Sequence, residues 1–470
     1  MFSYKQHWLK NIYDRLPVSL QNLMTSVYGL QHRRRVRGRY YYDYLEQLHK
    51  SQWDSPLELE RKQNEKLTKF VSYASLHSPY WHRVFREQKL EPDMIKSPAD
   101  LARLPLLEKE TVRCSLDELV SDEYRSGGKK AVTVHTSGTT GKALRLKISI
   151  EAWQREYAFR DDHRTWMGIK PDDRVATLAG HPVVSTNHLK PPFWRRNRAE
   201  NQIIFSAQHL TPETMPLYVE ELHRFQPHLL HGYPSALYLL ALYLDSQNIH
   251  TLRPRAVYTH SETLLDNQRA LLQRAFGCHV FDGYGNTERV AYIVECGQGS
   301  LHVRMEHSVI EFLRADGEAA RPGEMAEMVC TGFGNEAMPL VRYRVGDSAI
   351  YTDRPCPCGR GGTIVEKILG RVDDIIVTPD GRHVGRLDHV FKDLLNVVEA
   401  QIVQERIDAV RVRLVKRPEF GAEDMKTLER ELRLRLGTKM KLEYEFVESI
   451  PREANGKFRA VISKVALSIT

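Results

Sequence analysis

The chain has 470 residues, which is too long for one ordinary hydrophobic core, so two or more domains are expected. Its composition, 41% hydrophobic and 27% charged, is that of a soluble globular protein. No apolar run reaches the roughly 20 residues that cross a bilayer, and the first residues lack the pattern of a signal peptide. We therefore expect a cytoplasmic protein without a transmembrane segment.

The first 125 residues are predicted to be helical, with Pro79, Pro92, Pro98 and Pro105 separating the helices. A stretch such as Pro56–Ala74 places apolar residues at the three- and four-residue spacing of a helix.

This region also holds the densest part of the net charge of +8, namely Arg33–Arg35, Arg37 and Arg39 beside Tyr40–Tyr42. A solvated helix face with partly buried arginine stems is one interpretation. Stacking on a nucleic acid, docking of a protein partner and peripheral membrane contact are the others. We expect no nucleic-acid partner, because the net charge and this cluster are the only features of the sequence that favour one.

From about residue 130 to residue 350, short β-rich runs alternate with helical segments, which favours mixed α/β layers. Examples are the expected strands Ala131–Val134 and Val175–Leu178 and the expected helices Thr211–Phe225 and Asp266–Phe276.

A domain boundary is predicted near Gly370–Asp374, which divides the chain into a large domain, 1–371, and a small α+β domain, 372–470. Beyond the boundary we expect a strand, a turn at Pro379-Asp380-Gly381 and a second strand. The remaining elements expected there are a strand at Val410–Val415, a helix at Glu423–Leu436 and a strand at Leu442–Phe446.

A candidate anion-binding loop, Thr136-Ser137-Gly138-Thr139-Thr140-Gly141-Lys142, directly follows the strand-like Val132–His135. The alternative for a Ser/Thr/Gly loop taken alone is an ordinary surface turn. Its two glycines let the backbone approach an anion, its hydroxyls add donors, and Lys142 adds a positive charge. The spacing differs from that of a Walker loop, which has four residues between its glycines and a Ser or Thr after its lysine. It is also not a G-x-G-x-x-G dinucleotide turn.

The loop closely resembles the phosphate-loop signature of the adenylate-forming superfamily, which includes acyl- and aryl-CoA synthetases, luciferases and adenylation domains. Four further motifs of that superfamily follow in its order. They are Tyr284-Gly285-Asn286-Thr287-Glu288, Tyr343-Arg344-Val345-Gly346-Asp347, Gly370-Arg371-Val372-Asp373-Asp374 and Pro451-Arg452-Glu453-Ala454-Asn455-Gly456-Lys457. The resemblance implies a large mixed α/β domain with a small mobile α+β domain. It also implies activation of a carboxylic acid by ATP as an acyl-adenylate.

Within the superfamily the chain resembles the phenylacetate–coenzyme A ligase branch, and in particular CapK-like proteins, a group associated with capsular polysaccharide biosynthesis. This narrower resemblance depends on the helical amino-terminal segment, on His231–Ala236 and on the Cys356–Arg360 insertion.

The resemblance also assigns roles to motif residues. Glu288 would bind Mg²⁺, Asp347 would accept from ribose hydroxyls, and Arg371 would reach ribose or phosphate. The adenine would lie along Asp282, Gly283, Tyr284, Gly285 and Asn286. The alternatives are a surface glutamate, a turn-capping aspartate, an interdomain ion pair and a simple loop.

Lys457 would bridge the carboxylate and the α-phosphate during adenylation, whereas a lysine in an Asn-Gly-Lys turn is otherwise simply solvated. Asp373 would then lie at the hinge about which the small domain rotates.

A separate metal site is suggested by the close pair Cys356 and Cys358, together with Cys296 and His302 upstream. Three thiolates and one imidazole suit a structural tetrahedral Zn²⁺. The alternative is a loop of reduced cysteines, because C-x-C is tighter than the usual spacing.

The acyl pocket is less defined, and His181 and His260, followed by Ser261 and Glu262, are its candidate polar groups. We expect the acyl acceptor to be coenzyme A, as in ordinary relatives, or an amine or hydroxyl on a sugar or lipid-linked precursor. A catalytically idle scaffold in polysaccharide assembly is the competing hypothesis. Both a monomer and a homodimer stay open.

Overall fold

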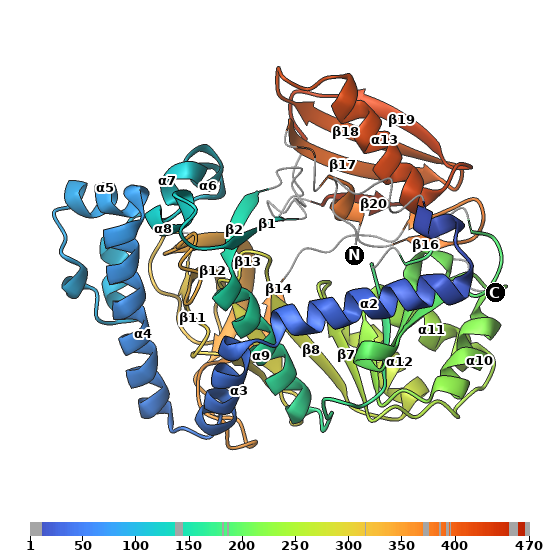
Figure 1. Ribbon diagram of the computed structural model, residues 1–470, viewed down its shortest axis with the longest axis horizontal. Helices are drawn as coiled ribbons and strands as arrows, with labels where there is room; N and C mark the ends of the chain where they lie inside the picture. The colour runs from blue at the N-terminus through green and yellow to red at the C-terminus, as the bar shows by residue number, and fades with distance from the viewer. Residues whose placement is uncertain are drawn as a thin grey trace.

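The structure is a computed structural model that describes residues 12–136, 144–180, 183–185, 188–314, 316–369, 376–384, 387–391, 394, 396–450 and 459–465. It has mixed α/β architecture, with a large amino-terminal part and a smaller carboxy-terminal part (Figure 1). Among the described helices, none combines the length and apolar character that a bilayer span requires.

Helices occupy most of the described chain up to residue 125. They are α2 Val18–Val36, α3 Arg39–Ser51, α4 Pro56–His77, α5 Pro79–Glu87, η2 Pro92–Met94, η3 Pro98–Arg103, α6 Lys109–Cys114, α7 Leu116–Leu119 and α8 Asp122–Arg125. The prolines begin several of them, because a proline at the first helical position loses no intrahelical hydrogen bond. Ser55 caps α4 by accepting from the Glu58 N–H at 3.3 Å.

Twelve described strands form one large sheet in the order β11-β12-β13-β14-β10-β9-β8-β7-β6-β3-β5-β4. Their bounds are β3 Val175–Ala179, β4 Trp194–Asn197, β5 Gln202–Ser206, β6 Leu229–Gly232, β7 Ala256–His260, β8 Val280–Gly285, β9 Tyr292–Glu295, β10 Leu301–Val303, β11 Ser308–Leu313, β12 Met325–Gly332, β13 Tyr343–Thr352 and β14 Ile364–Leu369. The run from β8 to β5 is parallel, whereas β9 to β14 form an antiparallel half.

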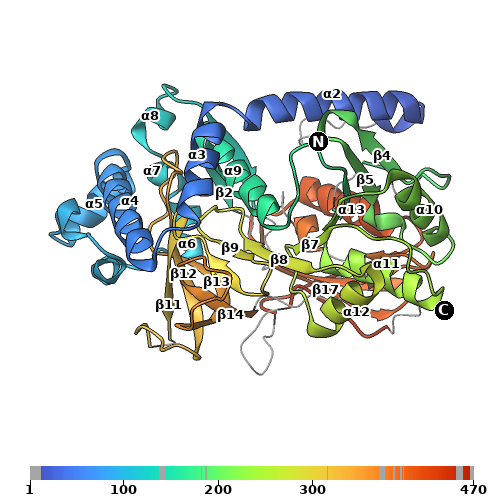
Figure 2. The ribbon, with the colours of Figure 1, turned by 90° about the horizontal axis from the view of Figure 1, so that it is seen from below.

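Two apolar cores follow these halves of the sheet. One lies between the parallel strands and α10 Met215–Phe225, α11 Pro234–Ser246 and α12 Asp266–Phe276. The other joins the antiparallel half to α4 and α5. On the antiparallel half, α3 and α9 (Ile150–Trp166) pack together over β9 (Figure 2).

Helix α10 begins at Met215, four residues after the start that the sequence pattern predicted. The reason is a polar turn, in which the Thr211 N–H donates to Thr214 Oγ1 at 3.0 Å and the Thr214 N–H donates to Thr211 Oγ1 at 3.3 Å. Such side-chain to backbone bonds compete with helix formation. The predicted helix Asp266–Phe276 is confirmed at both ends.

The carboxy-terminal part is built on a four-stranded sheet in the order β19-β18-β17-β20, covered by α13. Its elements are β15 Ile376–Val377, β16 His383–Val384, η6 Leu387–Phe391, β17 Val397–Arg406, β18 Ala409–Lys416, α13 Ala422–Leu436, β19 Lys441–Phe446 and β20 Val461–Ser463. It has a separate core and lies above the large sheet in Figure 1. The predicted boundary at 371/372 lies outside the described residues.

Among the described residues, few polar contacts join this part to the rest. Arg382 donates to the Gln208 carbonyl at 3.2 Å, and Arg417 lies 3.5 Å from the Glu110 carboxylate. Sparse polar contacts of this kind are typical of domains that can change their relative position.

Candidate functional site

The predicted adenine segment and His260 lie at the carboxyl ends of parallel strands, where ligands bind in open α/β sheets. Strand β8 carries Asp282, Gly283, Tyr284 and Gly285, and β7 ends at His260 beside it. Gly283 lies so close to Tyr258 that a Cβ there would displace the Tyr258 hydroxyl. The sheet thus brings the predicted adenine segment and a predicted pocket histidine side by side.

Two hydrogen bonds join the second and third motifs reciprocally. The Tyr284 hydroxyl donates to Asp347 Oδ2 at 2.8 Å, and the Tyr343 hydroxyl donates to Glu288 Oε1 at 3.0 Å. The tyrosine that begins each motif therefore holds the carboxylate that ends the other. Burial, followed by the nearby charge of Asp347, raises the pKa of Tyr284 well above its usual value, so this hydroxyl stays a donor.

Asp282 has an unusual environment for a carboxylate. Burial is the main cause that raises its pKa to about 7, and the charge of Glu295 raises it further. The Thr259 hydroxyl donates to Asp282 Oδ1 at 2.7 Å, which partly offsets that effect. Glu295 is held in place by Arg269, which contacts both of its oxygens at 2.8 and 2.9 Å.

His260 belongs to a group of rings at the ends of β6 and β7. Its ring centroid lies 4.5 Å from that of His231 and 5.8 Å from that of Tyr233, and its Nδ1 lies 2.7 Å from Ser261 Oγ. Glu262, two residues on, instead accepts from the N–H and hydroxyl of Ser235 at the start of α11. Its carboxylate therefore caps a helix, a role that the sequence did not indicate.

The predicted phosphate loop is carried by a two-stranded hairpin of β1 (Ala131–His135) and β2 (Arg145–Ser149). Thr136 closes its base, because its N–H donates to the Leu144 carbonyl at 3.0 Å and its hydroxyl accepts from the Leu144 N–H at 2.8 Å. Asn335 fastens the hairpin by accepting from the Ser149 N–H at 3.1 Å.

Ten further predicted residues lie outside the described part of the chain. They are Ser137, Gly138, Thr139, Thr140, Gly141, Lys142, His181, Arg371, Asp373 and Lys457. Their roles stay predictions.

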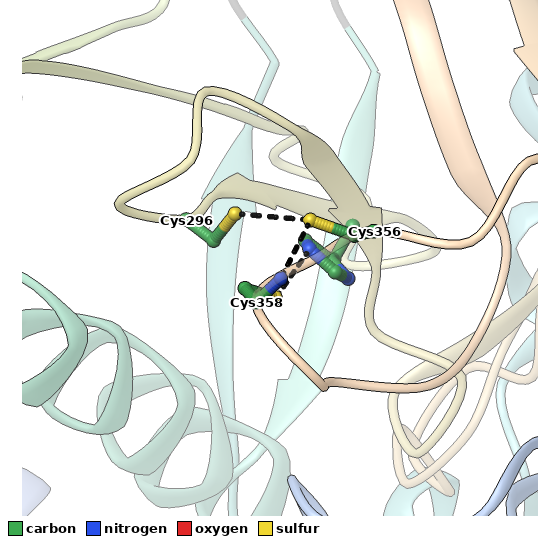
Figure 3. Close-up of side chains that lie close together, drawn as sticks. Cys296, Cys356 and Cys358 are labelled. Atoms are coloured by element: carbon green, nitrogen blue, oxygen red, sulfur yellow. Dashed lines mark hydrogen bonds between the residues drawn. The ribbon is translucent and has the colours of Figure 1, made fainter.

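The four predicted metal ligands converge, although they come from separate loops and strands. Figure 3 shows the three cysteines among them pointing toward one another. Their ligand atoms all lie within 4.8 Å of one another, with Cys296 Sγ 3.6 Å from Cys356 Sγ and Cys358 Sγ 3.4 Å from His302 Nε2. In a tetrahedron with Zn–S bonds of about 2.3 Å, ligand sulfurs lie about 3.8 Å apart. The donor set therefore fits Zn²⁺.

The surroundings keep the imidazole neutral but shift the pKa values of the two thiols in opposite directions. Burial lowers the pKa of His302 to about 4, so its imidazole is neutral, as a metal ligand must be. Burial raises the pKa of the Cys296 thiol to about 12. Burial also raises the pKa of Cys356, but hydrogen bonds from Ser300 and the Cys358 N–H outweigh this effect, so the pKa of Cys356 is lowered. Backbone N–H groups two residues on approach all three sulfurs at 3.4 to 3.5 Å.

A cavity of about 300 Å³ lies elsewhere, at the opposite ends of β6 and β7. Leu222, His228, Leu252 and Phe276 are among its lining residues, and it contains none of the predicted site residues.

Comparison with known proteins extends the resemblance over the whole chain. A family model described as the CapK C-terminal domain matches residues 376–464. Protein CapK of Staphylococcus aureus is 27% identical over 463 residues, covering 97% of this chain and 100% of that protein. The phenylacetate–coenzyme A ligase of Thermus thermophilus is 25% identical over 331 residues, 67% of this chain and 71% of that enzyme.

The chain is a homologue of CapK and of the phenylacetate–coenzyme A ligases. A phenylacetate–coenzyme A ligase of Pseudomonas putida gives a similar match, 25% identical over 68% of this chain and 72% of that enzyme.

Solved structures identify the fold as that of adenylate-forming ligases. A crystal structure of 2-hydroxyisobutyryl-CoA ligase in complex with 2-HIB-AMP and CoA matches 88% of this chain and 91% of that chain, with a TM-score of 0.59 and 20% identity. An open conformation of the same ligase gives a TM-score of 0.57.

Sequence reasoning did not foresee the residues that support the site. Thr259, Glu295 and Arg269 carry no motif, and they become adjacent to Asp282 only through the sheet. Tyr343 begins the third motif, but its hydrogen bond to Glu288 spans 55 residues and leaves no local signal in the sequence.

Proposed function

We propose that the protein activates a carboxylic acid with ATP, forming an acyl-adenylate and pyrophosphate, and then transfers the acyl group to coenzyme A. The observation that carries the proposal is the reciprocal pairing of Tyr284 with Asp347 and of Tyr343 with Glu288, next to the carboxyl end of β8. It fixes two carboxylates on adjoining motifs, and homology to phenylacetate–coenzyme A ligases supports the same chemistry.

Each fixed carboxylate has a task in this reaction. The acid and the α-phosphate are both anions, so their approach requires Mg²⁺ and cationic side chains to screen the charge. Glu288 is the proposed ligand of Mg²⁺, because a carboxylate oxygen is the donor that this ion prefers. Asp347 is the proposed acceptor for the ribose hydroxyls of ATP. Lys457 is the proposed cation at the α-phosphate, and Lys142 would steady the outer phosphates.

The reaction proceeds in two stages. A carboxylate oxygen of the substrate attacks the α-phosphorus of ATP, the bond to the bridging oxygen breaks, and pyrophosphate leaves. The coenzyme A thiolate then attacks the acyl carbon, the thioester forms, and AMP leaves. The few polar contacts between the carboxy-terminal part and the rest agree with a rotation between the stages.

The resemblance to CapK also bears on the biological role, and we propose capsular polysaccharide biosynthesis as the setting. In that setting, the second stage would transfer the acyl group to a sugar or lipid-linked acceptor in place of coenzyme A. An idle scaffold is the less favoured reading, because the acidic residues of both motifs are present and held by hydrogen bonds.

A pyrophosphate-release assay over aryl, short-chain and amino acids, with ATP and Mg²⁺, tests the activity. Release with at least one acid, followed by loss of the coenzyme A thiol when coenzyme A is added, supports it. No release with any acid, together with no nucleotide binding, would favour the scaffold.

We further propose that Cys296, His302, Cys356 and Cys358 hold a structural Zn²⁺. Four protein ligands leave no open position for chemistry, so the metal would fasten the turn after β9 to the loop between β13 and β14. Elemental analysis of protein purified without chelators should give one zinc per chain. Absence of stoichiometric zinc would remove the proposal.

A further inference from the structure

Helix α2 presents an apolar face to solvent, which reverses the usual arrangement of a surface helix. Its buried face consists largely of polar or small residues, Gln21, Thr25 and Gly29, with Val36 at the end. The exposed large apolar residues are Leu20, Leu23, Val27 and Leu30, whose exposed fractions are 44%, 58%, 47% and 41%. Their spacing of three, four and three residues places them along one face, the apolar stripe.

The helix is held by polar contacts rather than by this stripe. Asn22 Oδ1 accepts from the Arg196 N–H at 2.9 Å, and Ser26 Oγ accepts from the Arg198 N–H at 3.0 Å. A Cβ at Gly29 would collide with the Asn197 side chain, so this side chain packs directly against the α2 backbone. Figure 2 shows α2 along the outer edge of the fold, with no described element beyond it. Among the described residues, the apolar stripe therefore keeps about half of its side-chain surface exposed.

Positive charge continues the apolar stripe. Arg34 follows Leu30 by four residues and lies on the same face, with Arg35 beside it, and both are exposed. Within the described residues neither arginine has an ion pair with a carboxylate, and α2 contains no acidic residue. Tyr40 and Tyr42, just after the helix, are also 43% and 60% exposed.

These features distinguish between possible occupants of the face. Pairing of α2 with α2 of a second copy would cover the apolar stripe, but that helix offers no carboxylate for the arginines. A nucleic acid would neutralise the charge of the arginines but would leave the apolar stripe exposed to water. An anionic membrane surface accommodates both the apolar stripe and the arginines, because leucine and valine side chains enter the acyl boundary while arginines contact lipid phosphates.

We infer that α2 docks this protein on an anionic lipid surface, lying in the plane of the interface with Leu20, Leu23, Val27 and Leu30 inserted and Arg34 and Arg35 on the headgroup phosphates. The inference concerns a surface far from the proposed catalytic residues in sequence and does not depend on the proposed activity. It gives Arg34 and Arg35 a function that the adenylation chemistry does not supply, whereas Arg33 and Arg37 of the same cluster bond to Ala199 and Asp161 within the fold.

Cosedimentation with phosphatidylcholine vesicles, with and without phosphatidylglycerol, tests the inference. The protein should bind the anionic vesicles and be released by salt. Leu23→Ser with Val27→Ser should weaken binding at least about tenfold. Arg34→Ala with Arg35→Ala should weaken it about 25-fold, since each arginine contributes about fivefold near an anionic surface.

The matched control is Leu57→Ser with Leu76→Ser, which removes two leucines of α4 that are 77% and 68% exposed. Its binding should equal that of the unaltered protein. All variants should keep the melting temperature and the adenylation rate measured without vesicles, so a loss of binding is separable from a loss of fold or activity.

Three results would overturn the inference. The first is an unaltered protein that stays in the supernatant with anionic vesicles at low salt. The second is a control variant that loses as much binding as the Leu23 and Val27 variant. The third is a dimer in analytical ultracentrifugation that the same Leu23 and Val27 substitutions dissociate, because a second copy would then cover the face.

Discussion

Replacing Tyr343 by phenylalanine isolates the contribution of a single hydroxyl to the site. Tyr343 is fully buried, and its hydroxyl donates to Glu288 Oε1 at 3.0 Å. The substitution keeps the ring and its packing and removes the donor. Glu288, the proposed Mg²⁺ ligand, is then free to turn away from its present position.

A hydrogen bond to a charged group contributes about 1.5 to 3 kcal/mol. If that free energy orients Glu288 toward Mg²⁺, its loss raises the Mg²⁺ concentration needed for half-maximal activity by about tenfold or more. The companion substitution Tyr284→Phe frees Asp347 instead, so it should raise the KM for ATP while leaving the dependence on Mg²⁺ largely unchanged.

Acid-dependent exchange between pyrophosphate and ATP, titrated with Mg²⁺ and separately with ATP, measures both effects. Tyr218→Phe is the matched control, because its buried hydroxyl donates at 2.8 Å to the Ser206 carbonyl, outside the site. It should lower the melting temperature without moving either titration. An unchanged Mg²⁺ dependence in Tyr343→Phe, in an otherwise active enzyme, would refute the reasoning.

Three other predictions concern single residues. Because the pKa of Asp282 is raised from 3.8 to about 7, the folded state binds more protons than the unfolded state between these values, so this group makes the protein less stable as pH rises from about 4 to 7. Asp282→Asn should remove that part of the decline in melting temperature, and an identical pH profile would contradict the assignment. Cys358→Ser should abolish zinc binding and lower the melting temperature, whereas Cys114→Ser, at an exposed cysteine, should change neither. Lys457→Ala should abolish pyrophosphate exchange while ATP binding persists in calorimetry, and unchanged exchange would exclude its catalytic role.

Local patterns predicted individual elements well. The prolines, the apolar periodicity and the cap at Ser55 specify α4 directly, and a helix over Asp266–Phe276 could be predicted to the residue because Gly277 ends it with a φ of +61°. The predicted start of α10 at Thr211 was wrong, because paired threonine side chains stabilise a turn there. The extent of the antiparallel half of the sheet was not predicted, since strand pairing depends on contacts between distant residues.

The same distinction applies to the site. Motif residues such as Asp347 could be named from local sequence, and so could the cysteines and His302, because their side-chain chemistry suggests ligands. That the cysteines and His302 converge could be seen only from the fold. It places the sulfurs of Cys296 and Cys356, which are 60 residues apart in sequence, 3.6 Å from each other. The charged groups that shift the pKa of Asp282, Glu295 and Arg269, carry no recognisable pattern in the sequence.

The most direct test of the account is detection of the acyl-adenylate itself. The protein, ATP, Mg²⁺ and the acid that gives pyrophosphate release are mixed without coenzyme A, and the products are separated and analysed by mass spectrometry. The account predicts an acyl-AMP in amounts comparable to the enzyme, consumed when coenzyme A is added. Release of ADP and phosphate in place of AMP and pyrophosphate, with no acyl-AMP, would contradict it.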